Sequence, residues 1–211
     1  YSVTLNVSDG TNTTSQALTI SVTNVNDNDP VFTSSATFSA AENTTAVGTA
    51  TATDADTSDT LTFTLTGTDA ASFSINSSSG VITFNSAPDY ETKATYSVTL
   101  NVSDGTNTTS QALTISVTDV NEASPVITSS STFSAAENTT AVGTATATDT
   151  DTSDTLTFTL TGTDAASLSI NASSGVITFN SAPDYETKAT YSVTLNVSDG
   201  TNTTSQALTI S

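Results

Sequence analysis

Two short stretches rich in oxygen-bearing side chains could bind a metal ion. They are residues 22–30, VTNVNDNDP, and residues 117–125, VTDVNEASP. Each follows an apolar run, ends in a proline and contains no Lys or Arg. Carboxylates, amides and backbone carbonyls are the oxygen ligands that Ca²⁺ and Mg²⁺ take in proteins. We therefore interpret both stretches as metal-binding linkers between domains.

The composition of the 211-residue chain excludes most other chemistry. It has no Cys, His, Met or Trp, 21 acidic and two basic residues, and a formal net charge of −19. Imidazole bases, thiolate nucleophiles and the usual nitrogen or sulfur metal sites are thus excluded. Binding to nucleic acids or anionic membranes requires clustered Lys and Arg, and no apolar run is long enough to span a bilayer. We expect a protein that is not an enzyme, that does not insert into membranes, and whose small partner is a cation.

The sequence repeats itself almost without change. The string YSVTLNVSDGTNTTSQALTIS begins at Tyr1, Tyr96 and Tyr191, that is, every 95 residues. This period predicts the C-terminal hairpin of a truncated repeat at 1–21 and whole repeats at 22–116 and 117–211, each beginning with its linker. Such a period is typical of a sandwich domain and too long for a solenoid unit. We expect the chain to be part of a longer array.

Within each repeat, apolar and polar residues alternate with period two. The alternation is clearest at 61–65, 96–102 and 113–117 and is typical of strands with one buried face. Further strands are predicted at 31–39, 47–53, 72–76 and 80–84, separated by Gly, Asp and Pro turn signals. The predicted fold is all-β, with tandem seven-stranded Greek-key sandwiches in an extended rod.

The acidic residues concentrate at strand ends and turns. Asp54 and Asp56 are two residues apart, as are Asp89 and Glu91. On an extended chain this spacing places both carboxylates on one side, where repulsion costs free energy unless a cation lies between them. Asp89 and Glu91 could instead be a glycosidase pair, but no aromatic cleft accompanies them.

Lys93 and Lys188 are the only side-chain cations, one in each repeat. They could form isopeptide bonds with Asn. We favour the simpler interpretation, in which each is an exposed loop lysine that moderates the acidic field.

Five acidic motifs occur in a fixed order and recur with the 95-residue period. In the first whole repeat they are AEN at 41–43, DAD at 54–56, DYE at 89–91, SDG at 103–105, and the linker NVNDNDP at 24–30. This set covers the full repeat and resembles the cadherin repeats.

The resemblance implies up to three Ca²⁺ ions at each junction, bound by one domain, the linker and the next domain. At the second junction the implied ligands are Glu42, Asp89, Glu91, Asp119, Asn121, Glu122, Asp149, Asp151 and Asp199, with carbonyls near Val120 and Ala123. At the first junction they are Asn24, Asn26, Asp27, Asn28, Asp54, Asp56 and Asp104. Glu137, Asp184 and Glu186 would serve a later linker.

Some positions depart from the family pattern. Tyr90 stands where the family commonly has Arg, Asn24 replaces a linker Asp, and Glu122 begins an altered Asp-Asn-x motif. The absence of Trp removes the strand-swap adhesion of vertebrate cadherins. The near-identical, Thr-rich, Cys-free repeats are similar to those of large bacterial surface adhesins and fibres.

These observations predict an extracellular, calcium-binding extender of an adhesin or filament at the cell surface, in which Ca²⁺ at the junctions stiffens the rod. Its expected partners are calcium ions, adjacent repeats of the same chain and, in a fibre, identical chains. The alternative is that the repeats themselves mediate homophilic or polymerising contacts.

Overall fold

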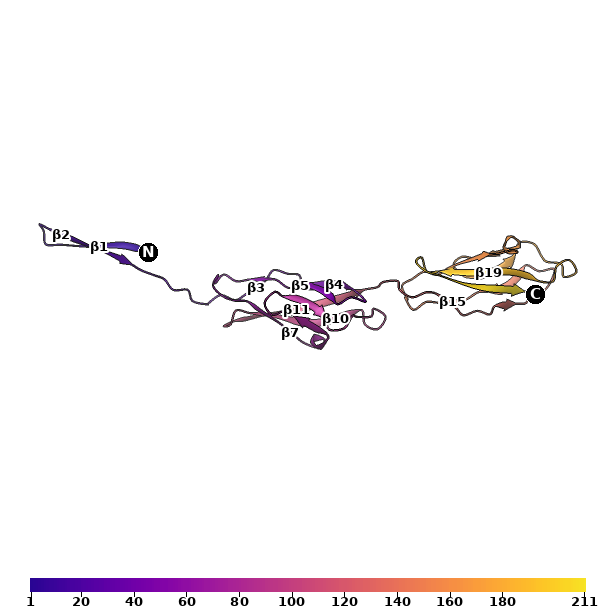
Figure 1. Ribbon diagram of the computed structural model, residues 1–211, viewed down its shortest axis with the longest axis horizontal. Coiled ribbons are helices and arrows are strands. Elements are labelled where there is room, and N and C mark those ends of the chain that lie inside the picture. The colour runs from indigo at the N-terminus through magenta and orange to yellow at the C-terminus, as the bar shows by residue number, and fades with distance from the viewer. The chain divides into compact units, whose positions relative to one another are not determined.

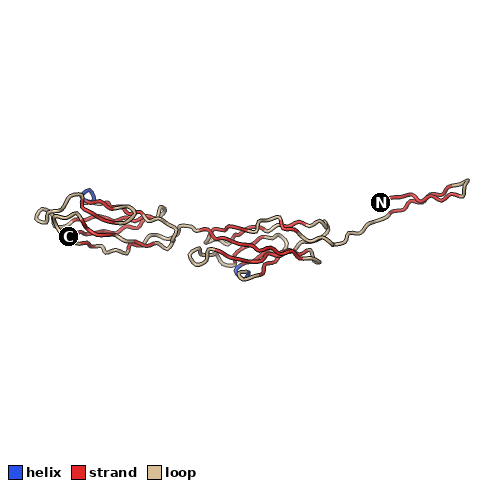
Figure 2. Tube along the Cα trace, turned by 180° about the vertical axis from the view of Figure 1, so that it is seen from behind, coloured by secondary structure: helices blue, strands red, loops and turns tan.

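The computed structural model describes residues 1–211, and strands and turns make up nearly all of it (Figure 2). The only helices are single 3₁₀ turns, η1 (Ala70–Ser72) and η2 (Ala165–Ser167), which are far too short to cross a membrane. The chain divides into two compact units. The first unit comprises residues 1–40, 45–86 and 95–116, and the second comprises residues 41–44, 87–94 and 117–211.

The chain begins with a hairpin of β1 (Ser2–Ser8) and β2 (Thr13–Thr19), paired antiparallel from Ser2 opposite Thr19. Its apolar side chains, such as Leu5, are exposed. The same sequence forms a buried hairpin in each sandwich, where the residue equivalent to Leu5 is Leu100 and is fully buried. The other strands of a repeat therefore bury the apolar side chains of this hairpin.

The first sandwich, indigo to magenta in Figure 1, contains nine strand segments. One sheet has the order β4–β11–β10–β7, and the opposite strands pair as β3–β6 and β5–β9–β8. The segments are β3 (Val31–Phe32), β4 (Thr37–Ala41), β5 (Ala46–Thr49), β6 (Ala52–Thr53), β7 (Thr62–Thr66), β8 (Phe73–Ile75), β9 (Val81–Phe84), β10 (Thr95–Ser103) and β11 (Thr108–Thr118).

The second sandwich, orange to yellow in Figure 1, repeats this topology as β13–β20–β19–β16, β12–β15 and β14–β18–β17, with β13 parallel to β20. Its segments are β12 (Val126–Ile127), β13 (Thr132–Phe133), β14 (Ala141–Thr144), β15 (Ala147–Thr148), β16 (Thr157–Thr161), β17 (Leu168–Ile170), β18 (Val176–Phe179), β19 (Tyr191–Ser198) and β20 (Thr203–Ile210).

The all-β prediction is confirmed, but two predicted strands are divided. The first strand, expected over 31–39, switches sheets, because β3 pairs with β6 while β4 joins β11. The strand expected over 47–53 breaks into β5 and β6 around Ala50, whose backbone N–H donates to Gly80 O (2.9 Å). Alternation of side chains does not report such a break, because the buried positions continue through it.

Period-two alternation accounts for the core. In the first sandwich, Ile82, Leu100 and Ile115 are fully buried, and each has a buried equivalent 95 residues later. An aromatic pair, Phe84 and Tyr96, packs edge to face with ring centroids 5.2 Å apart. Because the strands carry the core, the turns between them are free to carry acidic residues.

Gly175 lies in a turn that approaches the backbone of Ala145 closely. It has φ +70°, and a Cβ added there would lie 2.2 Å from Ala145 O. Gly162 has φ +102°, but an added Cβ would meet Thr194 N at 3.4 Å, an ordinary contact. Both Gly→Ala variants should lose about 1–2 kcal/mol through the left-handed backbone. Gly175→Ala should lose about 1–3 kcal/mol more through overpacking. Urea unfolding measures the difference, and equal losses would contradict the close approach.

Candidate metal centre

Glu42 connects two segments of the second unit. It follows β4, and Asn43 takes the left-handed conformation that Asn tolerates (φ 58°), with its N–H donating to Pro88 O (3.0 Å). Glu42 is 1% exposed. Its Oε1 accepts from Val120 N (2.7 Å) and its Oε2 from Tyr90 N (2.8 Å). One buried carboxylate thus holds both the linker and the turn that carries Glu91.

The Asp89–Glu91 pair lies in a turn and not on an extended chain. Lys93 N donates to Asp89 O (3.0 Å), and the N–H and Oγ1 of Thr92 donate to the Asp89 carboxylate (3.1 and 2.9 Å). The prediction that an extended backbone aligns these carboxylates is wrong. The same holds for the Asp54–Asp56 pair, where Asp56 N donates to Asp54 Oδ1 (2.9 Å) in a bend.

Two groups of carboxylates meet around Glu91. Oxygens of Glu42, Glu91 and Asp119 lie within 4.8 Å of one another, and so do those of Glu91, Glu122 and Asp151. These five residues come from two turns, the linker and the loop after β15, and all belong to the second unit. We call them the Glu91 cluster.

The linker is also held from its other side. Asp151 is 1% exposed, and its Oδ2 accepts from Ala123 N (2.8 Å). Asn202 Nδ2 donates to Ala123 O (2.6 Å) and to Asn121 Oδ1 (3.2 Å). Asp199 Oδ1 accepts from Asn202 N (2.6 Å), which fixes this loop in turn. The linker backbone is therefore positioned by side chains that precede and follow it in the sequence.

Seven carboxylate oxygens and one amide oxygen of the acidic sites are buried without a hydrogen-bond partner. These acceptors are Asn26 Oδ1, Asp54 Oδ2, Asp59 Oδ2, Glu91 Oε1, Asp104 Oδ2, Asp119 Oδ1, Asp149 Oδ2 and Asp199 Oδ2. Buried acceptors normally have a donor, and an unpaired buried charge is costly. An all-oxygen set of this kind fits a hard divalent cation such as Ca²⁺.

Crowding shifts the protonation of the central groups. Burial raises the pKa of Glu91, and the neighbouring carboxylates of Glu42 and Asp119 raise it further. Burial and then Asp151 raise the pKa of Asp154. The opposite occurs at Asp89, where the hydrogen bonds from Thr92 lower the pKa. The pKa values of Glu91 and Asp154 are thus raised first by burial and then by neighbouring negative charge.

Asp59 and Asp154 were not among the predicted ligands. Asp59 has a carboxylate oxygen within 4.8 Å of those of Asp54 and Asp56. Asp154 Oδ2 accepts a short hydrogen bond from Asn121 Nδ2. The signal was present in the sequence as an Asp three residues after each Asp-x-Asp motif, in both repeats.

At the first linker, Asp56 performs the task that Asp151 performs at the second. Its Oδ2 accepts from Asp27 N (3.0 Å) and Asn28 N (2.9 Å), and the bond from Asn28 lowers the pKa of Asp56. Asn107 Nδ2 donates to Asn28 O (3.2 Å). Asn26 is left with a buried, unpaired Oδ1 in this site.

Several predicted ligands use their side chains in hydrogen bonds to neighbouring groups, among them Asn24, Asp27 and Asp89. Asn24 Nδ2 donates to Ser58 Oγ (3.0 Å), and Asp27 Oδ1 accepts from Asn28 Nδ2 (3.1 Å). Asp89 is bonded within its own turn, as described above. These contacts leave their role as ligands a prediction.

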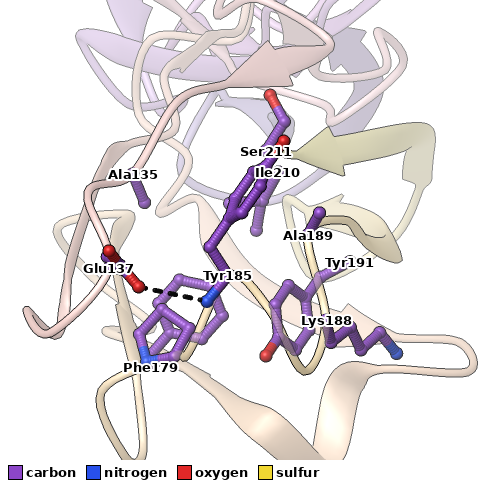
Figure 3. Close-up of a pocket in the computed structure, with 10 residues that line it drawn as sticks. Ala135, Glu137, Phe179, Tyr185, Lys188, Ala189, Tyr191, Ile210 and Ser211 are labelled. Atoms are coloured by element: carbon purple, nitrogen blue, oxygen red, sulfur yellow. Dashed lines mark hydrogen bonds between the residues drawn. The ribbon is translucent and has the colours of Figure 1, made fainter.

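The third set of predicted ligands, Glu137, Asp184 and Glu186, also comes together. Their oxygens lie within 4.8 Å of one another, but all three residues are exposed. Tyr185 N donates to Glu137 Oε2 (3.3 Å) at the rim of a cavity of about 30 Å³ that Ile210 and Ser211 also line (Figure 3). This arrangement matches that of Glu42 and Tyr90, without a linker above it.

Sequence comparison identifies the repeats. A family model described as "Cadherin domain" matches residues 35–118 and 131–211, more than half of the chain. The chain belongs to the cadherin family. Its two sandwiches are therefore cadherin repeats.

Several cadherins resemble the chain over most of its length. It is 32% identical over 197 residues to mouse cadherin EGF LAG seven-pass G-type receptor 1, covering 88% of this chain and 6% of that protein. It is 31% identical over 140 residues to mouse protocadherin Fat 4, covering 62% of this chain and 3% of that protein. Among solved structures, mouse cadherin-23 EC22-24 matches with 25% identity and a TM-score of 0.69, covering 99% of this chain and 72% of that structure's chain. The chain thus spans only 6% and 3% of the length of the two mouse proteins that it matches in sequence.

Glu42→Ala should destabilise its cadherin repeat even without an ion. The change leaves two N–H groups unpaired where hydrogen bonds to a charged acceptor contribute about 1.5–3 kcal/mol each. We expect a loss of about 3 kcal/mol or more in urea unfolding with chelator present. Glu137→Ala, at the equivalent exposed position, should cost about 0.5 kcal/mol or less. Equal losses would show that Glu42 does not hold the linker.

Asp154→Asn should stabilise the ion-free protein at neutral pH. Because the folded-state pKa of Asp154 is raised above its ordinary 3.8, protonation favours the folded state, and that stability is lost as pH rises through the folded pKa. With chelator, the variant should melt a few degrees higher than wild type at pH 7, and the gap should close towards pH 4.

Asp164→Asn is the control of opposite sign. The hydrogen bond from Lys188 lowers the pKa of Asp164, so its charge contributes stability above pH 3.8 that is lost as pH falls through the folded pKa. This variant should melt lower at pH 7. Thermal melts across pH 3–8 test both, and a higher melting temperature for Asp164→Asn would contradict the assignment.

Proposed function

We propose that this chain is a calcium-dependent extender from an extracellular adhesin or filament, in which Ca²⁺ at the linkers stiffens the connection between successive cadherin repeats. The observation that carries the proposal is the set of buried carboxylate oxygens around residues 117–125 that have no hydrogen-bond partner.

In the mechanism that we infer, the Glu91 cluster would hold Ca²⁺ together with further oxygens of the linker and the following sandwich. The bound ion would supply the positive charge that the site lacks. The chain's own residues prepare the site: Glu42 holds Val120 and Tyr90, and Asp151 holds Ala123. Since these bonds fix the backbone before an ion arrives, the remaining oxygens can face a common centre.

Without an ion, the clustered carboxylates repel one another. Glu91 takes part in both carboxylate groups, and its pKa is raised by burial and by its acidic neighbours. Repulsion would favour separation of the turns from the linker, and so a more mobile connection. Extracellular calcium modules bind with dissociation constants of about 10⁻⁴ to 10⁻³ M. The switch would therefore be set by extracellular calcium.

Assignment to the cell surface is supported by the relatives, which include the extracellular domain of protocadherin GammaB4, a fold match at 22% identity and a TM-score of 0.80. The curated relatives are mouse and human proteins. A bacterial adhesin or fibre remains our prediction from the near-identical, Cys-free, Thr-rich repeats.

Direct adhesion by the repeats is the alternative. One similar structure is described as a cis-dimer of protocadherin gammaB7. In this chain, however, the large exposed hydrophobic residues after residue 30 are five separate valines and Tyr185. On the outer sheet face, Ser110 donates to Asn101 and Asn101 to Thr66, so these groups satisfy one another. The uncharged side chains on this sheet face hydrogen-bond to one another. Such a face fits an extender better than an adhesive surface.

Calcium should raise the melting temperature and lengthen the particle. At a free concentration 100 times the dissociation constant, binding adds about 2.7 kcal/mol per site. Glu91→Gln, which alters both carboxylate groups, should lose most of this response. Asp9→Asn is the matched control, because it removes one charge from the 1–21 hairpin and can still accept from Thr11 N and Asn12 N.

Calorimetry and small-angle scattering, each with Ca²⁺ and with chelator, provide the measurements. A flat melting temperature would refute calcium binding. A calcium-dependent melting temperature with unchanged dimensions would refute the stiffening alone.

A further inference from the structure

The one lysine of the second repeat does not neutralise the acidic clusters. Lys188 Nζ lies 2.5 Å from Asp164 Oδ1 and 4.8 Å from the centroid of the Tyr191 ring. Asp164 belongs to none of the groups of clustered carboxylates. Lys188 is only two residues from Glu186, yet its ammonium group pairs with Asp164. Compensation of the clustered carboxylates therefore does not explain this pairing.

Asp164 is itself rigidly held. Its Oδ2 accepts from Ser192 N (2.8 Å), and its own N–H donates to Ser192 O (3.3 Å). Tyr191 packs edge to face against Phe179, a residue of the core, at 4.8 Å between centroids. The ammonium group of Lys188 is therefore fixed to two side chains of the sandwich body.

Lys188 also closes the turn that presents the acidic side chains. Its N–H donates to Asp184 O (2.9 Å). Within the turn, Thr187 Oγ1 donates to Asp184 Oδ2 (2.8 Å) and Glu186 N to Asp184 Oδ1 (3.2 Å). At the other end, Tyr185 N donates to Glu137 (Figure 3). The turn is thus anchored at its start by Glu137 and at its end by Lys188.

We propose that Lys188 is a positioning residue for calcium binding, which anchors the Asp184–Glu186 turn to the sandwich through Asp164 and Tyr191. By the 95-residue period, Lys93 has the same task for the turn that presents Glu91. The local frame is repeated there, since Lys93 N donates to Asp89 O (3.0 Å) and Ser97 N to Asp69 Oδ2 (2.8 Å). The inference rests on the proposed calcium binding.

Positioning and plain electrostatics predict opposite results. Removing a positive charge beside a cation site makes the surroundings more negative and should tighten calcium binding. Removing an anchor of the ligand-bearing turn should weaken it, as changes to groups that orient metal ligands typically cost 10–100-fold in affinity. The sign of the change therefore identifies the role.

The test is calcium affinity of the full chain, measured by calorimetric titration for Lys93→Met, because the turn of Lys93 presents Glu91 to linker residues 117–125. We expect affinity there to fall about 10-fold. Lys188→Met, whose turn has no linker above it, is the matched control and should leave this affinity unchanged. Lys93→Arg keeps the charge and the reach to the acid, and should restore most of the affinity. Asp69→Asn, combined with Lys93→Met, should give a loss that is less than additive, because the pair acts as a unit.

The outcomes separate the two proposals. No calcium binding by the wild-type chain would refute the proposed function. With wild-type binding intact, unchanged or tighter binding by Lys93→Met would overturn the positioning role. A lower melting temperature of Lys93→Met in chelator with unchanged affinity would assign this lysine to stability alone and would overturn it too.

Discussion

Electrostatic repulsion among clustered carboxylates, of which Glu42 and Asp151 are buried, is the constraint on which the rest of this protein depends. Carboxylate oxygens of Glu42, Glu91 and Asp119 lie within 4.8 Å of one another, and Glu91 meets Glu122 and Asp151 as well. The chain has 21 acidic residues but only two lysines and no arginine, so side-chain cations cannot neutralise these carboxylates. Folding therefore has to hold like charges together, and hydrogen bonds from backbone N–H groups do this only for part of the oxygens.

The β sandwich makes such crowding tolerable. Alternating apolar residues on β10 and β11 close the core, so the turns at the ends of the strands need contribute little to it. The carboxylates are carried by these turns and by the linker, and Glu42 and Asp151 hold the linker backbone from two directions. The hydrophobic core and the clustered carboxylates are thus separated spatially, with the core in the strands and the charge at their ends.

The two repeats show how far the same residues depend on their surroundings. Glu42 is 1% exposed beneath linker residues 117–125, whereas Glu137, its equivalent 95 residues later, is exposed. Both accept from the N–H of the following turn, at Tyr90 and Tyr185. Only Glu42 also accepts from a linker N–H, because the structure contains a linker above it. The linker is therefore part of the site and not only a connection.

The sequence by itself determined the repeat period, the all-β class and the oxygen-only chemistry, because period-two alternation and composition are local properties. It also placed the acidic motifs at strand ends. Tertiary structure decided which carboxylates meet: Glu91 reaches Asp151 across 60 residues of sequence, and Asp59 joins Asp54 and Asp56. It also brought Asp154 to the linker, where it accepts from Asn121. The Asp-x-Glu and Asp-x-Asp pairs were predicted on extended backbone but lie in turns, since hydrogen bonds from Thr92 and Asp56 N curl the chain there. Likewise, the pairing of Lys188 with Asp164 depends on the packed sandwich, because their contact joins two turns that alternation does not relate.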